Sequence, residues 1–217
     1  MLIVVGNEKG GCGKTTLAVH LAAAAAHAGR DTLLVDSDPG QQSAARWAAR
    51  RREAHPEANA VRCVSLTGRA IRDELEDLAR RYQVVVVDTG AEDSPELRAA
   101  VTVAGVLVIP LQPEPLDLWT LPTMEALVAR ARSFNAPLRV VVAVNRIPHQ
   151  LAAQTPQEIA GWIAENTPQL AAPPIVAIVG RTAYGRAIGE GLAVHETPRP
   201  DLKATREMEA LYQEVTR

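Results

Sequence analysis

The sequence predicts an α/β domain in which a doubly wound, mostly parallel β-sheet is flanked by helices. Three observations support this fold class. Short apolar runs alternate with segments of helical periodicity along the 217-residue chain, which is typical of parallel strands joined by crossover helices. Residues 84–87 are four consecutive valines, as expected for a central strand that is buried on both faces. A glycine-rich stretch follows the first apolar run, where such sheets bind phosphate groups.

Length and composition indicate a single domain over residues 1–217, because a chain of this size buries one full core but is short for two. Hydrophobic residues make up 47% and charged residues 22%, as in ordinary globular proteins. A net charge of −2 excludes a general attraction to nucleic acid, so any DNA binding would need a local patch. We find no secretory signal and no run of about 18 apolar residues, so we expect a cytoplasmic protein without integral membrane association. Cys12 and Cys63 lack metal-ligand spacing and are expected to be free thiols.

The first apolar strand, Leu2–Val5, leads into the sequence GNEKGGCGKTT over residues 6–16, and a helix is expected from about Gly13 to Gly29. Glycines let the backbone curl until several N–H groups point at an anion, and the helix dipole adds positive potential. In such a loop Lys14 is expected to bind the β- and γ-phosphates of a nucleotide and the Thr15 hydroxyl to ligate Mg²⁺.

Lysine is scarce outside this loop. Of 23 basic residues only three are lysines, namely Lys9, Lys14 and Lys203. An ammonium group is a compact, flexible charge that a planar guanidinium does not replace. Two of the three lysines lie in one loop, which indicates that the chemistry there needs them. Glu8 replaces the glycine that the ordinary motif has five residues before Gly-Lys.

The segment KGGCGKTT resembles the deviant Walker A box of the ParA/MinD-type ATPases. The resemblance implies a P-loop NTPase fold, ATP and Mg²⁺ as cofactors, and an ATPase activity that is weak alone and stimulated by a partner. Lys9 matches the signature lysine that reaches across a dimer to the other subunit's nucleotide. The loop residues that the resemblance assigns to nucleotide binding are Lys9, Gly10, Gly11, Cys12, Gly13, Lys14, Thr15 and Thr16.

Two carboxylate segments follow predicted strands. The apolar run 32–35 is closed by DSDPG, which resembles the family's DxDPQ segment. The resemblance implies that Asp38 orients the attacking water, with Asp36 as the alternative for that role and as a candidate metal ligand. It also implies that Asp88, after the valine run, holds Mg²⁺ through water and that the Gly90 backbone senses the γ-phosphate. The simpler alternatives are an ordinary Asp-Pro-Gly turn and a capping role for Asp88.

The remaining elements are expected in order. Prolines 113 and 115 predict an extended loop before a helix that begins near Leu118. The last helix is expected to pack Leu202, Met208, Leu211 and Val215 on the domain. The other predicted elements are helices over 42–54, 69–81 and 201–216, an edge strand over 61–65, and buried strands over 105–111, 139–144 and 175–179.

Two segments are candidates for the base of the nucleotide and for DNA. In the family an asparagine at the end of strand 139–144 reads the adenine edge, which suits an amide, so Asn145 and Arg146 are expected there. Residues 180–196 resemble a segment of the small ParF-like partition ATPases whose arginines contribute to nonspecific DNA binding. This resemblance makes candidates of Arg181, Arg186, Lys203 and Arg206.

The charges of residues 181–217 and 42–54 do not by themselves predict DNA binding. Residues 181–217 hold six basic and six acidic residues, so they do not form a basic tail. The helix over 42–54 carries Arg46, Arg50, Arg51 and Arg52, which would contact DNA or a partner, or form a solvated face, the simpler interpretation.

The resemblance is strongest to the small ParF-like ATPases, which lack an N-terminal helix-turn-helix and include carboxysome-positioning McdA-type proteins. It implies a homodimer bridged by ATP that binds nonspecific double-stranded DNA, is nucleoid-associated in the cytoplasm, and positions a plasmid, chromosome region or protein organelle. A ParB-like activator or cargo adaptor would stimulate hydrolysis. The alternatives are a MinD-like membrane switch, for which residues 208–217 are a poor amphipathic helix, a P-loop enzyme that phosphorylates a small substrate, and a binding protein with negligible turnover.

Overall fold

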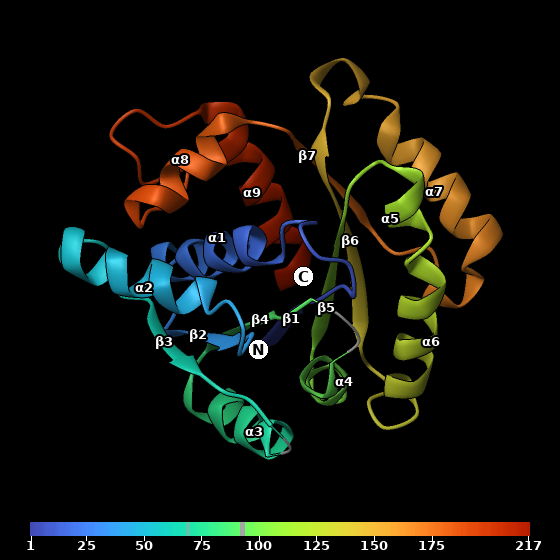
Figure 1. Ribbon diagram of the computed structural model, residues 1–217, viewed down its shortest axis with the longest axis horizontal. Coiled ribbons are helices and arrows are strands. Elements are labelled where there is room, and N and C mark those ends of the chain that lie inside the picture. Colours follow the sequence, from blue (N-terminus) through green and yellow to red (C-terminus); the bar gives the residue numbers. More distant parts are fainter. Residues whose placement is uncertain (69, 92–93) are drawn as a thin grey trace.

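The computed structural model describes residues 1–68, 70–91 and 94–217 (Figure 1). Among them, seven strands form one sheet in the order β3-β2-β4-β1-β5-β6-β7, and all of its pairings are parallel rather than mostly so. The strands are β1 (Leu2–Val5), β2 (Thr32–Ser37), β3 (Arg62–Ser65), β4 (Val84–Thr89), β5 (Val106–Leu111), β6 (Arg139–Ile147) and β7 (Ile175–Val179). Because β1 lies at the centre and the chain winds outward on both sides of it, a crevice is expected at the carboxyl end of β1.

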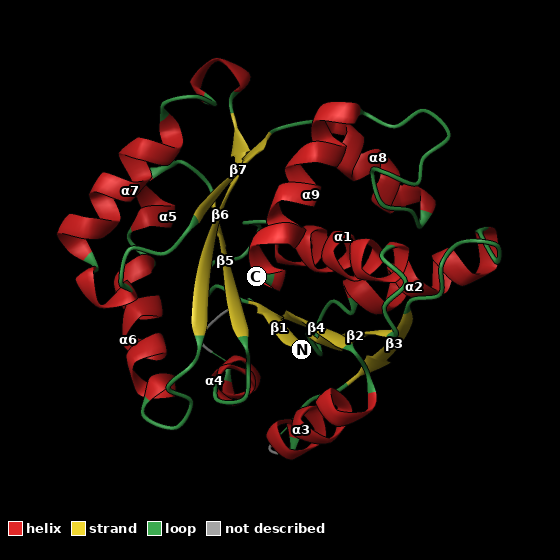
Figure 2. Cartoon of the chain, turned by 180° about the vertical axis from the view of Figure 1, so that it is seen from behind, coloured by secondary structure: helices red, strands yellow, loops and turns green. Residues whose placement is uncertain are grey.

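Helices cover both faces of this sheet (Figures 1 and 2). One face packs against α1 (Lys14–His27), α2 (Ser43–Ala54), α8 (Thr182–Glu190) and α9 (Leu202–Thr216). The other face packs against α3 (Ile71–Arg81), α4 (Pro95–Val101), α6 (Leu121–Arg132) and α7 (Thr155–Asn166). The short helix α5 (Pro115–Leu118) and two 3₁₀ turns, His149–Leu151 and Pro168–Leu170, complete the described elements. The doubly wound fold is therefore confirmed.

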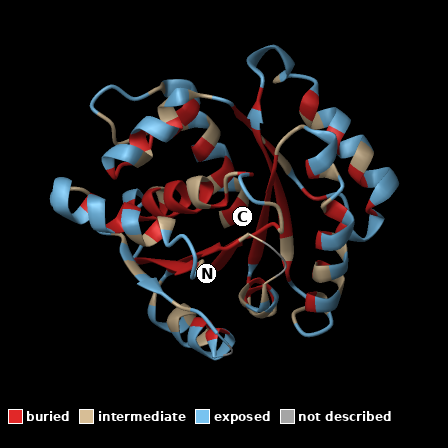
Figure 3. Ribbon diagram, viewed as in Figure 1, coloured by how far each residue is buried: buried red, intermediate tan, exposed pale blue. Residues whose placement is uncertain are grey.

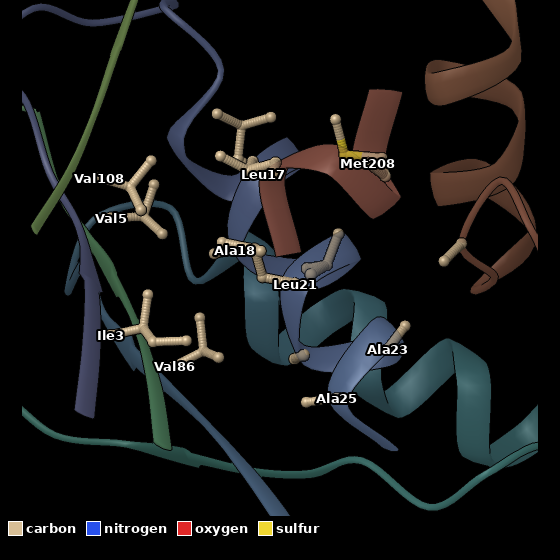
Figure 4. Close-up of a cluster of buried hydrophobic side chains, with 14 of the residues drawn as sticks. Ile3, Val5, Leu17, Ala18, Leu21, Ala23, Ala25, Val86, Val108 and Met208 are labelled. Carbon is tan, nitrogen blue, oxygen red and sulfur yellow. The ribbon is translucent and has the colours of Figure 1, made fainter. Parts of the chain in front are cut away.

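Helix α1 is buried on nearly all sides, because the sheet lies on one side of it and α9 on another (Figure 3). Its alanines let neighbouring elements approach closely, and an all-round apolar helix is the kind that a core accommodates. Figure 4 shows Leu17 and Ala18 of α1 beside Val5 and Val108 of the sheet, with Met208 of α9 nearby. The helix that carries the phosphate loop is thus held from several directions.

Several expectations need correction. Helix α5 begins at Pro115, within the stretch expected to be extended, because proline is tolerated in the first turn, where its missing N–H has no partner to lose. Leu202 is 66% exposed and does not pack on the domain, since it lies in the first turn of α9 and faces solvent. Residue 69, the expected start of α3, lies outside the described residues. Helices α4 and α7 were not anticipated.

Candidate nucleotide-binding site

The glycine-rich loop between β1 and α1 adopts a conformation that requires glycine at two positions. Gly11 has φ +78° and Gly13 has φ +104°, the left-handed region that strains other residues. At Gly13 a Cβ would lie 2.1 Å from Nδ2 of Asn145. Gly10 and Gly11 are exposed, so the loop presents its backbone to solvent at the N-terminus of α1. This is an arrangement that suits an anion.

Both loop lysines contact the protein itself. The Lys14 ammonium, 7% exposed, donates to the Lys9 carbonyl oxygen at 2.8 Å. The Lys9 ammonium forms an ion pair with Oδ1 of Asp117 on α5. Asp117 is fully buried, and its Oδ2 accepts a hydrogen bond from the Gln112 N–H at 2.8 Å. The lysine expected to reach a second subunit is therefore engaged within its own chain.

Asp117 was not anticipated as a site residue. It lies 108 positions from Lys9 in the sequence, within a segment whose prolines suggested only a loop. The sequence signal at this position is a carboxylate between two leucines, Leu116 and Leu118, and this pattern also occurs in many surface turns. Asp117 is identified as a site residue by the contact between α5 and the phosphate loop.

The two carboxylate segments meet beside the loop. Strands β2 and β4 are adjacent, and their register places Asp36 opposite Asp88. Asp36 is buried and accepts hydrogen bonds from the backbone N–H of Asp38 at 3.1 Å and of Ala45 at 2.9 Å. Asp38 is half-buried, and a Cβ at Gly90 would lie 3.4 Å from its carboxyl carbon. Residues that are 52 positions apart in the sequence thus lie side by side at this point.

Asp88 provides a test of whether a metal ion fits here. Its Oδ1 is buried and has no hydrogen-bond partner among the described residues. Burial raises the pKa of Asp88 to about 7, the Thr15 hydroxyl opposes that rise, and the charge of Asp36 adds to it. A buried carboxylate with a free oxygen, next to a second carboxylate and a hydroxyl, is a donor set that suits Mg²⁺ and its bound waters.

The remaining loop residues support the loop from within. Cys12 is buried, its thiol donates to the Lys9 carbonyl at 3.3 Å, and burial raises its pKa. The Thr16 carbonyl is paired with Nδ1 of His20 at 2.7 Å. These contacts fix the loop and the first turn of α1.

Asn145 and Arg146 lie at an irregular point of β6, where the register with β7 shifts between residues 144 and 147. Nδ2 of Asn145 donates to the Cys12 carbonyl at 2.9 Å, and its Oδ1 accepts from the Arg146 N–H at 2.9 Å. Arg146 is exposed and has φ +56°. In this structure the Asn145 amide therefore supports the phosphate loop, and its contact with adenine stays a prediction.

The candidate DNA-binding residues differ in whether their charge is already paired within the protein. Arg181 donates to Glu207 through Nε at 3.1 Å and Nη2 at 2.8 Å, and the hydroxyl of Tyr184 donates to the same carboxylate at 2.6 Å. This network joins α8 to α9 and argues against Arg181 as a phosphate contact, because its charge is neutralised. Arg186, Lys203 and Arg206 are exposed, and no described acidic side chain pairs with them.

Two kinds of feature are absent from the described residues. No group of three or more histidine, cysteine, aspartate or glutamate side chains could hold a metal ion by itself. None of the described helices is long and apolar enough to cross a membrane.

Comparison with known proteins gives consistent relatives. A family described as ATPase MipZ matches residues 1–163. The maintenance of carboxysome distribution protein A of Gloeobacter kilaueensis is 45% identical over 118 residues, which are 54% of this chain and 51% of that protein. The protein of the same name from Halothiobacillus neapolitanus is 28% identical over 220 residues, which are 98% of this chain and 95% of that protein.

Solved structures share the fold. Cyanothece McdA bound to ATP superposes with a TM-score of 0.78 at 15% identity, covering 100% of this chain and 96% of that one. The cell division ATPase MinD of Pyrococcus furiosus superposes with a TM-score of 0.76 at 17% identity, covering 99% and 98%. The chain spans about half the length of the G. kilaueensis relative, 51%, although it spans 95% of the H. neapolitanus protein.

Proposed function

Because the chain belongs to the MipZ family of ATPases, within the ParA/MinD group, we propose that it is an ATP-dependent positioning ATPase, with residues 1–217 acting as one domain. The observation that carries the proposal is the phosphate loop with Lys14 beside the buried pair Asp36 and Asp88. The cofactors are ATP and Mg²⁺, which are found in the structures of McdA with ATP and of Pyrococcus horikoshii MinD with Mg-ADP.

Each residue has a proposed part in the reaction. Loop N–H groups bind the phosphates, and Lys14 moves from the Lys9 carbonyl to the β- and γ-phosphates. Thr15, Asp36 and Asp88 would hold Mg²⁺, which supplies positive charge against the phosphate oxygens. Asp38 orients a water for attack on the γ-phosphorus. The new bond joins that water's oxygen to phosphorus, the bond to the ADP oxygen breaks, and the proton that the water loses passes to an oxygen of the released phosphate.

Dimerisation requires Lys9 to leave Asp117. In the proposed dimer each Lys9 contacts the other subunit's nucleotide, and Asn145 and Arg146 lie near the adenine. The ATP-bound dimer binds nonspecific double-stranded DNA and is thereby nucleoid-associated in the cytoplasm, with Arg186, Lys203 and Arg206 as phosphate contacts. Hydrolysis, stimulated by an adaptor or a ParB-like partner that also binds the cargo, releases it. Relatives named for carboxysome distribution and for partition support a positioning role.

Retention on nonspecific duplex DNA tests this function. The purified protein is applied with ATP, ADP or no nucleotide at 50 and 200 mM salt, beside Lys14→Ala as the variant that cannot bind phosphate. We expect salt-sensitive retention with ATP alone and none for the variant, because a loop without its lysine loses the charge that binds the β- and γ-phosphates. Retention that ignores the nucleotide would overturn the proposal. ATP-dependent binding to anionic liposomes in place of DNA would favour a membrane switch.

A further inference from the structure

The exposed side of α2 carries three arginines, Arg46, Arg50 and Arg52, that no described acidic side chain pairs with. The helix buries Ala44, Trp47, Ala48 and Arg51 against the domain. Arg46 and Arg50, one turn apart, point away from that face and are exposed, and no described acidic side chain pairs with either. Two like charges at this spacing destabilise a helix by about 0.2–0.5 kcal/mol. An anion bound at this surface would remove that repulsion.

The surface offers charge but few apolar anchors. Protein interfaces are centred on exposed aromatic or aliphatic residues, whereas the one aromatic residue of α2, Trp47, is 3% exposed and donates to the Leu192 carbonyl at 3.3 Å. Arginine pairs without such a centre suit a polyanion with regularly spaced phosphates. The chemistry therefore favours a nucleic-acid backbone over a protein partner.

The first turn of α2 is connected to the nucleotide site. Gln42, which precedes the helix, makes no side-chain cap. The Ala45 N–H donates instead to Oδ2 of Asp36 at 2.9 Å, and the Gln42 N–H donates to the Asp38 carbonyl at 3.2 Å. Since uncapped N–H groups destabilise a helix start, any change in what Asp36 contacts is transmitted to α2.

The last turn of α2 is fixed to α8. Arg51, 3% exposed, donates to both carboxylate oxygens of Glu196, at 2.7 and 2.5 Å, and to the Gly191 carbonyl at 3.3 Å. Gly191 ends α8, and a Cβ at this position would lie 2.7 Å from the backbone nitrogen of Arg51. The exposed Arg186 of α8 thus belongs to an element that contacts α2. Figure 1 shows the two helices on the same side of the sheet.

We propose that Arg46 and Arg50, together with Arg186, form a surface that binds the phosphate backbone of double-stranded DNA, and that α2 links this surface to the carboxylates of the nucleotide site. The proposal rests on the proposed function and deepens it, because it adds α2 to the DNA contacts. Engagement of Asp36 by Mg²⁺ alters the cap of α2, and the position of the arginines changes with it.

The test compares Arg46→Gln/Arg50→Gln with the control Arg72→Gln/Arg80→Gln. The control removes the same charge from exposed arginines of α3, on the opposite face of the sheet. Affinity for a 40-base-pair duplex is measured with ATP and Mg²⁺ between 50 and 200 mM salt. The salt slope falls by about 0.9 for each phosphate contact removed, so the α2 variant should have a slope smaller by about 1.8 per subunit. Over this fourfold salt range, that slope difference makes the variant's loss of affinity about tenfold smaller than that of the wild type for each subunit that contacts the duplex.

The outcomes separate the two proposals. If the wild type binds DNA and the α2 variant has the slope and affinity of the α3 control, the surface assignment is overturned while the function stands. If the wild type does not bind DNA, both are overturned. Loss of binding to poly-L-glutamate with unchanged DNA binding would assign the surface to an acidic protein. The link through Asp36 requires faster hydrogen exchange at residues 43–54 on adding ATP and Mg²⁺, and unchanged exchange contradicts it.

Discussion

The Lys9–Asp117 ion pair predicts that the chain restrains its own dimerisation. Lys9 must leave Asp117 before it can reach a second subunit, and Asp117 has no exposed surface. The substitution Asp117→Asn keeps an oxygen that can accept from the Gln112 N–H but removes the charge that holds the lysine. We expect the variant to dimerise more tightly with ATP.

The magnitude follows from the type of bond that is lost. The single oxygen of the new asparagine accepts from the Gln112 N–H, so its NH₂ group faces Lys9 and the hydrogen bond from Lys9 to a charged group is lost. Such a bond contributes about 1.5–3 kcal/mol. Because the Lys9 side chain is 28% exposed, solvent weakens the pair, and the substitution lowers the cost of releasing Lys9 by the smaller figure, about 1.5 kcal/mol. At about tenfold per 1.4 kcal/mol, the two subunits together give the ATP-dependent dimer an approximately hundredfold lower Kd. A carboxylate left buried without its partner would make the gain larger.

Sedimentation velocity with ATP and Mg²⁺, over a concentration series, measures this constant. The double variant Lys9→Ala/Asp117→Asn is the matched control, and it should lose the gain because the lysine that benefits is gone. Thermal unfolding verifies that both variants fold. A Kd equal to that of the wild type, in a folded Asp117→Asn protein, would refute the reasoning, and a gain that persists without Lys9 would show that it has another origin.

Three further predictions concern catalysis and stability. Asp38→Ala should retain ATP and dimerise but lose phosphate release, which a malachite-green assay measures; undiminished hydrolysis would transfer the role to Asp36. Burial lowers the pKa of His20 to about 4 from 6.5, so the His20 contribution to stability falls by about 3 kcal/mol as the pH drops from about 6.5 to 4. Asp88, whose pKa is raised to about 7, contributes in the opposite direction. His20→Leu should therefore gain about 3 kcal/mol relative to the wild type across this window in urea denaturation, and a difference between the two proteins that does not change with pH would count against it. Glu196→Gln leaves Arg51 buried without its counter-charge and should cost about 3 kcal/mol of unfolding free energy, whereas an unchanged melting temperature would disprove the anchoring role.

Short sequence patterns were sufficient to predict the features that depend only on neighbouring residues. The phosphate loop could be predicted because two left-handed positions admit glycine readily and a lysine must follow them. The valine run of β4 gave a central strand because a parallel sheet buries both faces. The same rules misjudged Pro115, since proline blocks a helix interior but suits its first turn.

The sequence by itself determined the fold class, the phosphate loop and the two carboxylate segments, because each depends on the order of residue types over a few positions. Only the tertiary structure decided which distant groups meet. It paired Lys9 with Asp117, aimed the Asn145 amide at the Cys12 carbonyl, neutralised Arg181 with Glu207, and left Arg46 and Arg50 exposed. The physical reason is that charge pairing and exposure depend on distances between side chains in space. Packing of the whole chain sets these distances, and they cannot be read from the spacing of residues along the sequence.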